Sequence, residues 1–328
     1  MKTVLLTGAT GFVGTHLSRR LLSRGWNVKA AIRSREGVAR LVDSVEGHIV
    51  GPINGTTDWD NALKDVDIVI HLAARVHVMH DTSENPLEAY REVNVRGTRR
   101  LLDASVGSGV RRFIFMSSVK AVGDETPVGV PFTETDSRQP QDAYGVSKAE
   151  AEQIVLEYSS SGKIETTVLR PPMVYGPGVK ANFWRLMRAV DAGLPLPFKS
   201  VRNKRSMVYV QNLVDAVMAC CEHPAACGQV FFVADDRPLA TSELIQELAR
   251  ALGKRPRLVP APLPVLRGAA RVVGMTAEMD RLIGSLVVST DKIKSELGWR
   301  PPWSVSEGIL DTVNWYRIAR DKVELGDK

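Results

Sequence analysis

Hydrophobic residues in the first half of the chain form short continuous runs that alternate with amphipathic helical patterns. Short apolar runs are typical of strands covered on both faces, and their alternation with helices predicts a parallel sheet with crossover helices. The predicted strands are Thr3–Thr7, Val28–Ile32, Gly47–Val50, Ile68–Leu72, Phe113–Ser117 and Thr166–Leu169. The main predicted helices between them are Val13–Ser23, Pro86–Gly107 and Tyr144–Ser160. The pattern predicts an α/β fold with a doubly wound sheet.

After residue 170 prolines become frequent and the pattern changes. The predicted strands here are Met207–Val210 and Val230–Val233, and the predicted helices are Leu213–Cys221, Thr241–Leu252 and Ser306–Arg320. We expect residues 1–170 to form the sheet domain, and residues 171–328 to form mainly a smaller C-terminal lobe, with some segments returning to the sheet. The lobe should cover the carboxyl edge of the sheet, where doubly wound folds bind ligands.

A glycine-rich turn follows the first predicted strand and opens the first predicted helix. Gly8 allows a sharp turn, Gly11 allows the backbone to approach a pyrophosphate, and Gly14 allows close packing of helix on strand. The N-terminus of the helix then faces the phosphate charge. The sequence therefore predicts a Rossmann dinucleotide site, whose turn residues are Gly8, Thr10, Gly11, Phe12, Val13 and Gly14.

The end of the second strand helps to choose between the two nicotinamide dinucleotides. Sites selective for NAD place an acidic residue here to bind the ribose, whereas an arginine accommodates the 2′-phosphate of NADP. This chain has Arg33, Ser34 and Arg35, and no acid. Both arginines could instead be solvated surface cations. The sequence favours NADP(H), and NAD(H) stays possible.

A third pattern combines Tyr144 and Lys148, four residues apart on one helix face, with Ser117 and Ser118 at the end of a strand. An ammonium near a phenol lowers the phenol pKa from about 10, which makes tyrosine a usable acid or base. Ser118 can donate a hydrogen bond to a substrate carbonyl. The predicted chemistry is interconversion of a carbonyl and an alcohol.

Composition excludes several classes of protein. The excess of 43 Lys+Arg over 37 Asp+Glu is mild and dispersed, and fits a phosphorylated small substrate at least as well as nucleic acid. Cys220, Cys221 and Cys227 have neither metal-site nor disulfide spacing, so we expect no metal and a reducing compartment. The apolar start is too short for a signal segment or a membrane span. We expect a cytoplasmic protein without membrane insertion or nucleic-acid binding.

Motifs along nearly the whole chain resemble those of the extended short-chain dehydrogenase/reductases, in the NAD-dependent epimerase/dehydratase family. They read TGATGFVG (7–14), HLAA (71–74), NVRGT (94–98), FIFMSS (113–118), YGVSK (144–148), LRPPMVYGPG (169–178), RSMVYVQNLVDAV (205–217) and LGWRPPWSVSEGI (297–309).

The resemblance implies roles for individual residues. It makes Ser118, Tyr144 and Lys148 the catalytic set, with Lys148 also on the nicotinamide ribose. Asn94 would order the helices of the active site. Further cofactor contacts would come from Leu72, Ala73, Ala74, Ser117, Pro171 and Val174. Besides Ser118 and Tyr144, the nucleotide-sugar site would use Asn182 and Arg205 on the diphosphate and Leu196 and Phe198 around the base. Asn182 could instead be a helix N-cap, and Phe198 a core aromatic.

Three departures from the family pattern matter. The third strand is followed by Val50-Gly51-Pro52-Ile53 instead of an Asp, so backbone contacts from Ile53 would have to serve adenine. Val119 and Lys120 replace the Asp–Glu pair of sugar dehydratases, which argues against dehydration. Arg33 fits a one-way NADPH reductase better than an epimerase that retains NAD.

The leading hypothesis is therefore reduction of the C4 keto group of a nucleotide sugar, of the UDP-4-keto-2-acetamido-2,6-dideoxyhexose type, in cell-surface polysaccharide synthesis. The alternative is C4 epimerisation of a UDP-sugar or a lipid-pyrophosphate sugar with bound NAD. An NADPH-dependent reductase of a non-sugar ketone and a non-catalytic cofactor sensor are further alternatives. The resemblance also implies a homodimer formed by Pro86–Gly107 and Tyr144–Ser160, with Ala89, Val93 and Leu101 of the first helix against Ile154 and Tyr158 of the second. These apolar stripes could equally face the sheet.

Overall fold

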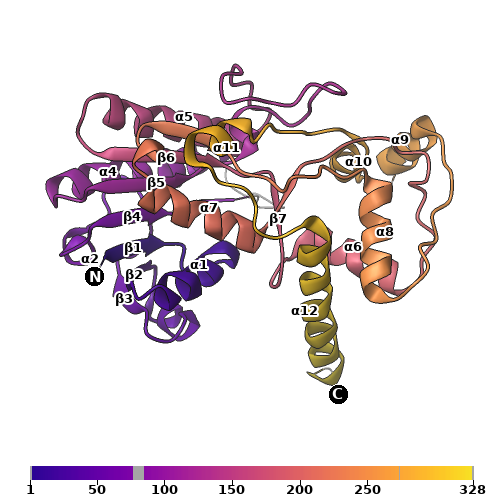
Figure 1. Ribbon diagram of the computed structural model, residues 1–328, viewed down its shortest axis with the longest axis horizontal. Coiled ribbons are helices and arrows are strands. Elements are labelled where there is room, and N and C mark those ends of the chain that lie inside the picture. The colour runs from indigo at the N-terminus through magenta and orange to yellow at the C-terminus, as the bar shows by residue number, and fades with distance from the viewer. Residues whose placement is uncertain (1, 77–84, 273, 327–328) are drawn as a thin grey trace.

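A computed structural model describes residues 2–76, 85–272 and 274–326 (Figure 1). Its main sheet is parallel, with seven strands in the order β3-β2-β1-β4-β5-β6-β9. The strands are β1 (Thr3–Thr7), β2 (Asn27–Ile32), β3 (Glu46–Ile49), β4 (Ile68–His71), β5 (Arg112–Met116), β6 (Glu165–Arg170) and β9 (Gln229–Phe232). The order reverses between β1 and β4, which is the switch point where such sheets bind ligands. The predicted doubly wound Rossmann fold is confirmed.

Helices cover both faces of the sheet, because alternate side chains of each buried strand point to opposite sides. Leu6, Ile70 and Ile114 pack under α1 (Phe12–Ser23), α7 (Val210–Glu222) and α11 (Asp291–Leu297). Leu5, Val69, Phe113 and Val168 pack under the other layer, which consists of α2 (Asp60–Leu63), α4 (Gly97–Gly107) and α5 (Ala143–Ser160). This two-sided burial explains why the strands read as continuous apolar runs.

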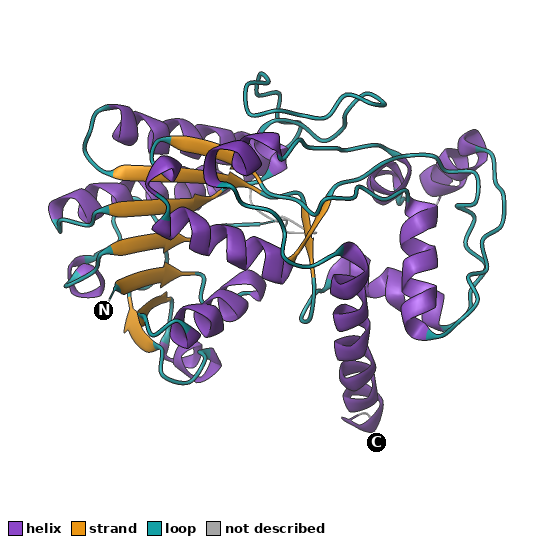
Figure 2. Cartoon of the chain, in the orientation of Figure 1, coloured by secondary structure: helices purple, strands orange, loops and turns teal. Residues whose placement is uncertain are grey.

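Five further helices gather at the carboxyl side of the sheet around a core of their own (Figure 2). They are α6 (Ala181–Asp191), α8 (Thr241–Leu252), α9 (Leu263–Val272), α10 (Thr276–Ile283) and α12 (Val305–Gly326). A two-stranded parallel sheet of β7 (Met173–Tyr175) and β8 (Met207–Tyr209) joins this lobe to the main sheet. Segments after residue 170 do return to the main sheet, since β9 pairs with β6 and α7 and α11 pack on one face.

The structure differs from the predicted elements in two places that bear on the site. The predicted helix Pro86–Gly107 is three pieces, α3 (Pro86–Arg91), a π-helical turn η2 (Glu92–Arg96) and α4. A π turn inserts one extra residue, and here it directs Asn94 at neighbouring segments. Strand β7 escaped prediction because it directly follows Pro171 and Pro172 and is only three residues long.

A buried ion pair fixes α5 to the sheet. Arg170 at the end of β6 donates to both carboxylate oxygens of Glu152 on α5, at 3.0 and 2.7 Å, and both side chains are almost fully buried. Removing one partner of such a pair leaves an uncompensated buried charge, which is strongly destabilising. The pair therefore sets the position of the helix that carries Tyr144 and Lys148.

Candidate functional site

The glycine turn has the geometry that a dinucleotide needs. Gly8 adopts φ +74°, and a Cβ there would lie 2.9 Å from Ala73 N. A Cβ on Gly14 would lie 2.1 Å from Gly8 O, so only glycine lets α1 pack this close to the turn. Gly11 caps α1 without a side-chain hydrogen bond, and the first turn carries no acidic residue. Thr10, Phe12 and Val13 thus surround a helix N-terminus suited to an anion.

A directional hydrogen-bond chain holds the segment of Ala73 against this turn. Thr98 donates to Asn94 O at 2.7 Å, which leaves its oxygen to accept from His71 Nε2 at 3.0 Å. His71 Nδ1 then accepts from Thr7 Oγ1 at 2.7 Å, while Thr7 Oγ1 accepts from Ala73 N at 3.1 Å. Burial lowers the pKa of His71 to about 3, so the ring is neutral as this chain requires.

His71, Thr98 and Thr7 were not among the predicted site residues. Their only signal in the sequence was membership of the motifs HLAA, NVRGT and TGATGFVG. They orient the backbone of Leu72, Ala73 and Ala74 beside the turn.

Asn94 links three elements of the site. Its side chain accepts from Arg75 N at 2.8 Å and donates to Arg75 O at 3.0 Å and to Ser147 Oγ at 2.9 Å. Ser147 lies on α5 between Tyr144 and Lys148. The π turn therefore ties the end of the segment after β4 to the helix that carries the predicted catalytic pair.

Ser118, Tyr144 and Lys148 come together at the carboxyl end of β5. Ser118 caps the short helix η3 (Val119–Ala121), and its side chain is hydrogen-bonded to Tyr144. Lys148 is buried, donates to Met116 O at 2.6 Å and lies 4.0 Å from the centre of the Phe115 ring. Ser117 Oγ, beside them, is buried without a hydrogen-bond partner in the described residues. The arrangement places an acid or base and a hydroxyl donor within reach of one substrate oxygen.

In the protein by itself, the pKa values of Tyr144 and Lys148 differ from their ordinary values. Burial raises the pKa of Tyr144 to about 12, partly offset by its hydrogen bond to Ser118, and Asp142 adds to the rise. Burial also lowers the pKa of Lys148 to about 7. The expected lowering of the Tyr144 pKa by Lys148 is therefore wrong for the protein alone, because desolvation of the phenol dominates the shift.

Lys120 is a site residue that sequence reasoning used only as an argument against dehydration. Its ammonium lies 2.6 Å from Asp142 Oδ2 and 2.9 Å from Asp124 Oδ1. Asp142 in turn caps α5 by accepting from Gly145 N at 2.7 Å. A Cβ on Gly145 would lie 2.5 Å from Lys120 O, so η3 and the start of α5 are in close contact. Lys120 therefore clamps the helix of Tyr144 to the turn of Ser118.

Arg205 lies on the lobe side of the site, where it donates to Gly284 O at 3.1 Å. Burial lowers the pKa of its guanidinium, and the nearby charges are those of Asp124, Glu125 and Arg281. Arg281, which sequence reasoning did not select, brings a second cation to this place. A cavity of about 570 Å³ opens next to it, lined by the loop residues Val122, Gly123, Asp124, Glu125, Pro127, Phe132, Asp136, Ser137, Gln139 and Gln141.

The other predicted substrate residues, Asn182, Leu196 and Phe198, lie in the lobe. Asn182 is exposed in the first turn of α6, but Lys180 is its N-cap, so the N-cap alternative for Asn182 is wrong. Leu196 bridges to Leu258, and its N–H donates to Arg257 O at 2.8 Å. Phe198 is buried in the core of the lobe, as the core-aromatic alternative held.

The remaining predicted cofactor residues lie along the carboxyl edge of the sheet. Ile53 packs against Gly97, where a Cβ would come within 2.6 Å of it. Pro171 accepts from Val119 N at 3.0 Å and so lies beside the Ser118 turn, and Val174 lies in β7. Arg33 is exposed at the end of β2. No group of three or more His, Cys, Asp or Glu in the described part of the chain could hold a metal ion.

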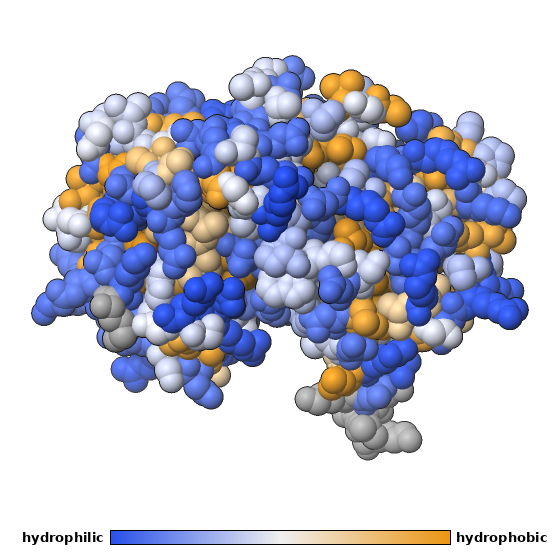
Figure 3. Space-filling view, in the orientation of Figure 1, coloured by the Kyte–Doolittle hydropathy of each residue, from blue (hydrophilic) through white to orange (hydrophobic). Residues whose placement is uncertain are grey.

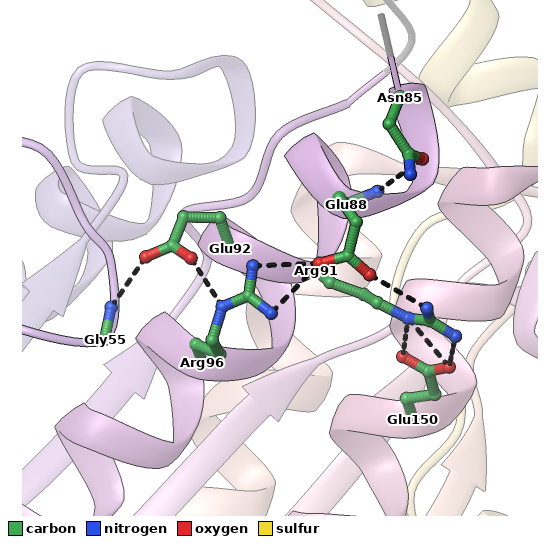
Figure 4. A network of polar contacts seen from close by, with 7 residues as sticks. All are labelled: Gly55, Asn85, Glu88, Arg91, Glu92, Arg96 and Glu150. Atoms are coloured by element: carbon green, nitrogen blue, oxygen red, sulfur yellow. Dashed lines mark hydrogen bonds and ion pairs between the residues drawn. The ribbon is translucent and has the colours of Figure 1, made fainter.

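A polar network connects α3 and the π turn with α5 (Figure 4). Arg91 donates to Glu150 on α5 at 2.6 Å and to Glu88 at 3.0 Å, and Arg96 joins Glu88 to Glu92. Glu92 also accepts from Gly55 N at 3.1 Å. The helices proposed for a dimer interface are thus fixed to one another within one chain.

Part of the apolar stripes of these helices faces the sheet, whereas Ala89 and Val93 are only partly buried. Leu101, Ile154 and Tyr158 are buried in the core between the sheet and α4 and α5. These three residues therefore pack against the sheet, which was the alternative to a dimer interface. Across residues 2–76, 85–272 and 274–326, no helix has the length and apolar character to cross a bilayer.

The chain is similar to known proteins along most of its length. The model of the NAD-dependent epimerase/dehydratase family matches residues 4–234. A UDP-glucose 4-epimerase of Vibrio cholerae is 43% identical over 98% of this chain and 97% of that protein. An N-acetyl-alpha-D-glucosaminyl-diphospho-ditrans,octacis-undecaprenol 4-epimerase of Escherichia coli O157:H7 is 27% identical over 98% of this chain and 97% of its own length. The structure of a UDP-glucose 4-epimerase of Thermus thermophilus in complex with NAD is 27% identical, with a TM-score of 0.75 over 96% of this chain and 99% of that chain.

Proposed function

The chain belongs to the NAD-dependent epimerase/dehydratase family and is an extended short-chain dehydrogenase/reductase, and we propose that it epimerises a UDP-hexose at C4 with NAD. The observation that carries the proposal is 43% identity to a UDP-glucose 4-epimerase along almost the whole chain. The joint placement of Ser118, Tyr144 and Lys148 supports it. The similarity favours epimerisation over the C4 keto reduction that led the sequence analysis.

In this proposal Tyr144 is the acid and base at the C4 oxygen of the sugar. Ser118, hydrogen-bonded to Tyr144, also holds that oxygen and stabilises the carbonyl form of the substrate. Lys148 reaches from α5 to the carboxyl end of β5, where it would hold the nicotinamide ribose. When bound, the nicotinamide ring supplies a hydride acceptor and donor and, in its oxidised form, a positive charge.

The residues that would hold the dinucleotide fit it. Gly8, Gly11 and Gly14 leave room for a pyrophosphate at the uncapped N-terminus of α1, and the buried hydroxyl of Ser117 has no partner in the described residues. We propose NAD as the cofactor, with Arg33 as a solvated surface cation. Titration with NAD⁺ and NADP⁺ tests this: at least tenfold tighter NADP⁺ binding that is lost in Arg33→Ala would contradict it.

For the sugar nucleotide, we propose that Arg205 and Arg281 bind the diphosphate. Arg205 lies close to the acidic side chains of Asp124 and Glu125 and already donates to Gly284 O, so it is held in place before substrate binds. The expected result is a loss of affinity for UDP of tenfold or more in Arg205→Ala, since charge-assisted bonds to phosphate are strong. Unchanged UDP affinity would remove Arg205 from the site.

The experiment that tests the function is incubation of the purified protein with UDP-glucose and no added reductant. Formation of UDP-galactose, followed by chromatography, is the expected result, and Tyr144→Phe should abolish it. No epimer from UDP-glucose or UDP-N-acetylglucosamine, together with NADPH oxidation on a 4-keto nucleotide sugar, would restore the reductase hypothesis. The dimer, a cytoplasmic location and a role in polysaccharide synthesis stay predictions.

A further inference from the structure

Helix α9 presents an apolar face to solvent. Only two of its residues, Leu266 and Ala270, are buried, one helical turn apart, and Leu266 packs into the core of the lobe. The exposed part of the helix includes the apolar residues Pro264, Val265, Gly268, Ala269 and Val272, flanked by the exposed Arg267 and Arg271. Val265 is 59% and Val272 88% exposed. A water-facing helix side is normally polar, so this face has the character of a contact surface.

Exposed apolar residues continue on both sides of this helix. Val259 and Leu263 precede the face, and Met275 follows it, all three at least 40% exposed. Figure 3 shows orange surface mixed with blue at the end of the molecule where Figure 1 places α9. These apolar residues therefore lie on one segment, which we call the α9 surface (residues 255–272 and 274–281).

The α9 surface is also strongly basic. It contains the five arginines Arg255, Arg257, Arg267, Arg271 and Arg281, against the two acids Glu278 and Asp280. Five minus two gives a formal charge of +3, half of the +6 of the whole chain. All five arginines are exposed, and among the described side chains only Arg267 approaches an acid of this segment, Asp280 at 3.6 Å. The partner of this surface should therefore be both apolar and anionic.

These properties distinguish between possible occupants. A second copy placed symmetrically would bring arginines against arginines, which repel each other. Nucleic acid would find no aromatic ring on this helix face for its bases to stack on. A bilayer that contains anionic lipids meets both requirements, because the apolar face enters the interfacial region and the arginines meet the headgroups.

We propose that the α9 surface docks the protein on an anionic lipid bilayer, with α9 lying in the plane of the membrane interface. Arg281 of the same surface lies near Arg205 at the substrate site. Docking would therefore bring that site beside the membrane, where a sugar on a membrane-anchored diphosphate could reach it. The docking itself does not depend on the proposed function, because it is measured without turnover.

Co-sedimentation with vesicles tests the proposal. The full chain should bind vesicles of phosphatidylglycerol mixed with phosphatidylcholine, and should bind vesicles of phosphatidylcholine alone at least tenfold more weakly. Val272→Asp should weaken binding about tenfold or more, since a valine loses its burial and an acid meets anionic lipid. Arg271→Glu should weaken it by a similar factor, and high salt should weaken all binding.

Val128→Asp is the matched control. Val128 is also 88% exposed, but it lies in a loop whose neighbouring charges, Glu125 and Glu134, are acidic. This variant should bind vesicles like the parent, and equal melting temperatures should show that all variants are folded. The proposal is overturned if the parent does not bind phosphatidylglycerol vesicles, if Val128→Asp weakens binding as much as Val272→Asp, or if Val272→Asp instead splits an oligomer seen by light scattering.

Discussion

Replacing Lys120 with methionine should lower the stability of the fold only slightly but lower the rate of catalysis strongly. Methionine keeps the apolar length of the side chain but removes the charge that bridges Asp142 and Asp124. The three side chains are 20 to 33% exposed, so each ion pair is screened and is worth about 0.5–1 kcal/mol. The free energy of unfolding should therefore fall by only about 1–2 kcal/mol.

The effect on catalysis should be larger than this suggests. The charge of Asp142 raises the pKa of Tyr144, and Lys120 compensates that charge from 2.6 Å. If Lys120 no longer offsets about 1 kcal/mol of the repulsion between Asp142 and the Tyr144 phenolate, the pKa of Tyr144 rises by roughly one unit. Because Tyr144 is the base in the proposed reaction, and the positive charge of bound oxidised nicotinamide would lower its pKa toward the assay range, kcat of Lys120→Met should fall about tenfold at neutral pH and recover at higher pH.

The assay is the pH profile of kcat for UDP-hexose epimerisation. Lys120→Arg should keep the parent profile, and the double variant Lys120→Met/Asp142→Asn should regain it, since an amide oxygen still accepts from Gly145 N without a charge. A rate loss in Lys120→Met that is equal at every pH, or that the double variant does not correct, would refute the electrostatic reasoning.

Three further predictions concern the cofactor turn, a buried base and the buried ion pair. Gly14→Ala should reduce bound NAD at least tenfold by absorbance of the purified protein, because its Cβ would meet Gly8 O, whereas Gly107→Ala, with open space around it, should not. Burial lowers the pKa of His71 to about 3, so between about pH 6.5 and pH 3 only the unfolded chain takes up a proton on this side chain. The free energy of unfolding should therefore fall by about 1.4 kcal/mol per pH unit as the pH decreases from 6.5 toward 3. The variant His71→Leu should lack this contribution. Glu152→Ala should cost about 3–5 kcal/mol in urea unfolding, and Glu150→Ala, which loses a partly exposed pair on the same helix, no more than about 1 kcal/mol.

Each of these has a contradicting result. Equal NAD content in the two glycine variants would show that the turn does not need Gly14. The same pH slope in His71→Leu as in the parent would assign the slope to other groups. Similar losses in the two glutamate variants would mean that the pair in the core is worth no more than a surface pair.

Much of the fold was predictable because apolar runs and helical patterns alternate strictly up to residue 170, as they must when both faces of a sheet are covered. The turn at Gly8 and the spacing of Tyr144 and Lys148 are local, so the sequence reveals them. The π turn at Asn94 was not predictable, because tertiary contacts to Arg75 and Ser147 define it.

Other parts of the site depend on groups far apart in the sequence. The roles of Lys120 and His71 arise from partners 22 and 27 residues away, Asp142 and Thr98, that only the fold brings near. The pKa of Tyr144 was predicted in the wrong direction because a pairwise argument ignores desolvation, which dominates in a buried site. Arg33 favoured the reductase hypothesis, but a cation at the end of β2 is only indirect evidence about the reaction at C4.

Turnover of UDP-glucose that carries deuterium at C4 tests the central claim most directly. If Tyr144 and Ser118 handle the C4 oxygen while the hydrogen at C4 passes to a bound nicotinamide and back, the UDP-galactose formed in ordinary water keeps its deuterium, as mass spectrometry would show. Loss of deuterium to solvent, or no epimer from a protein shown to contain bound NAD, would contradict the account.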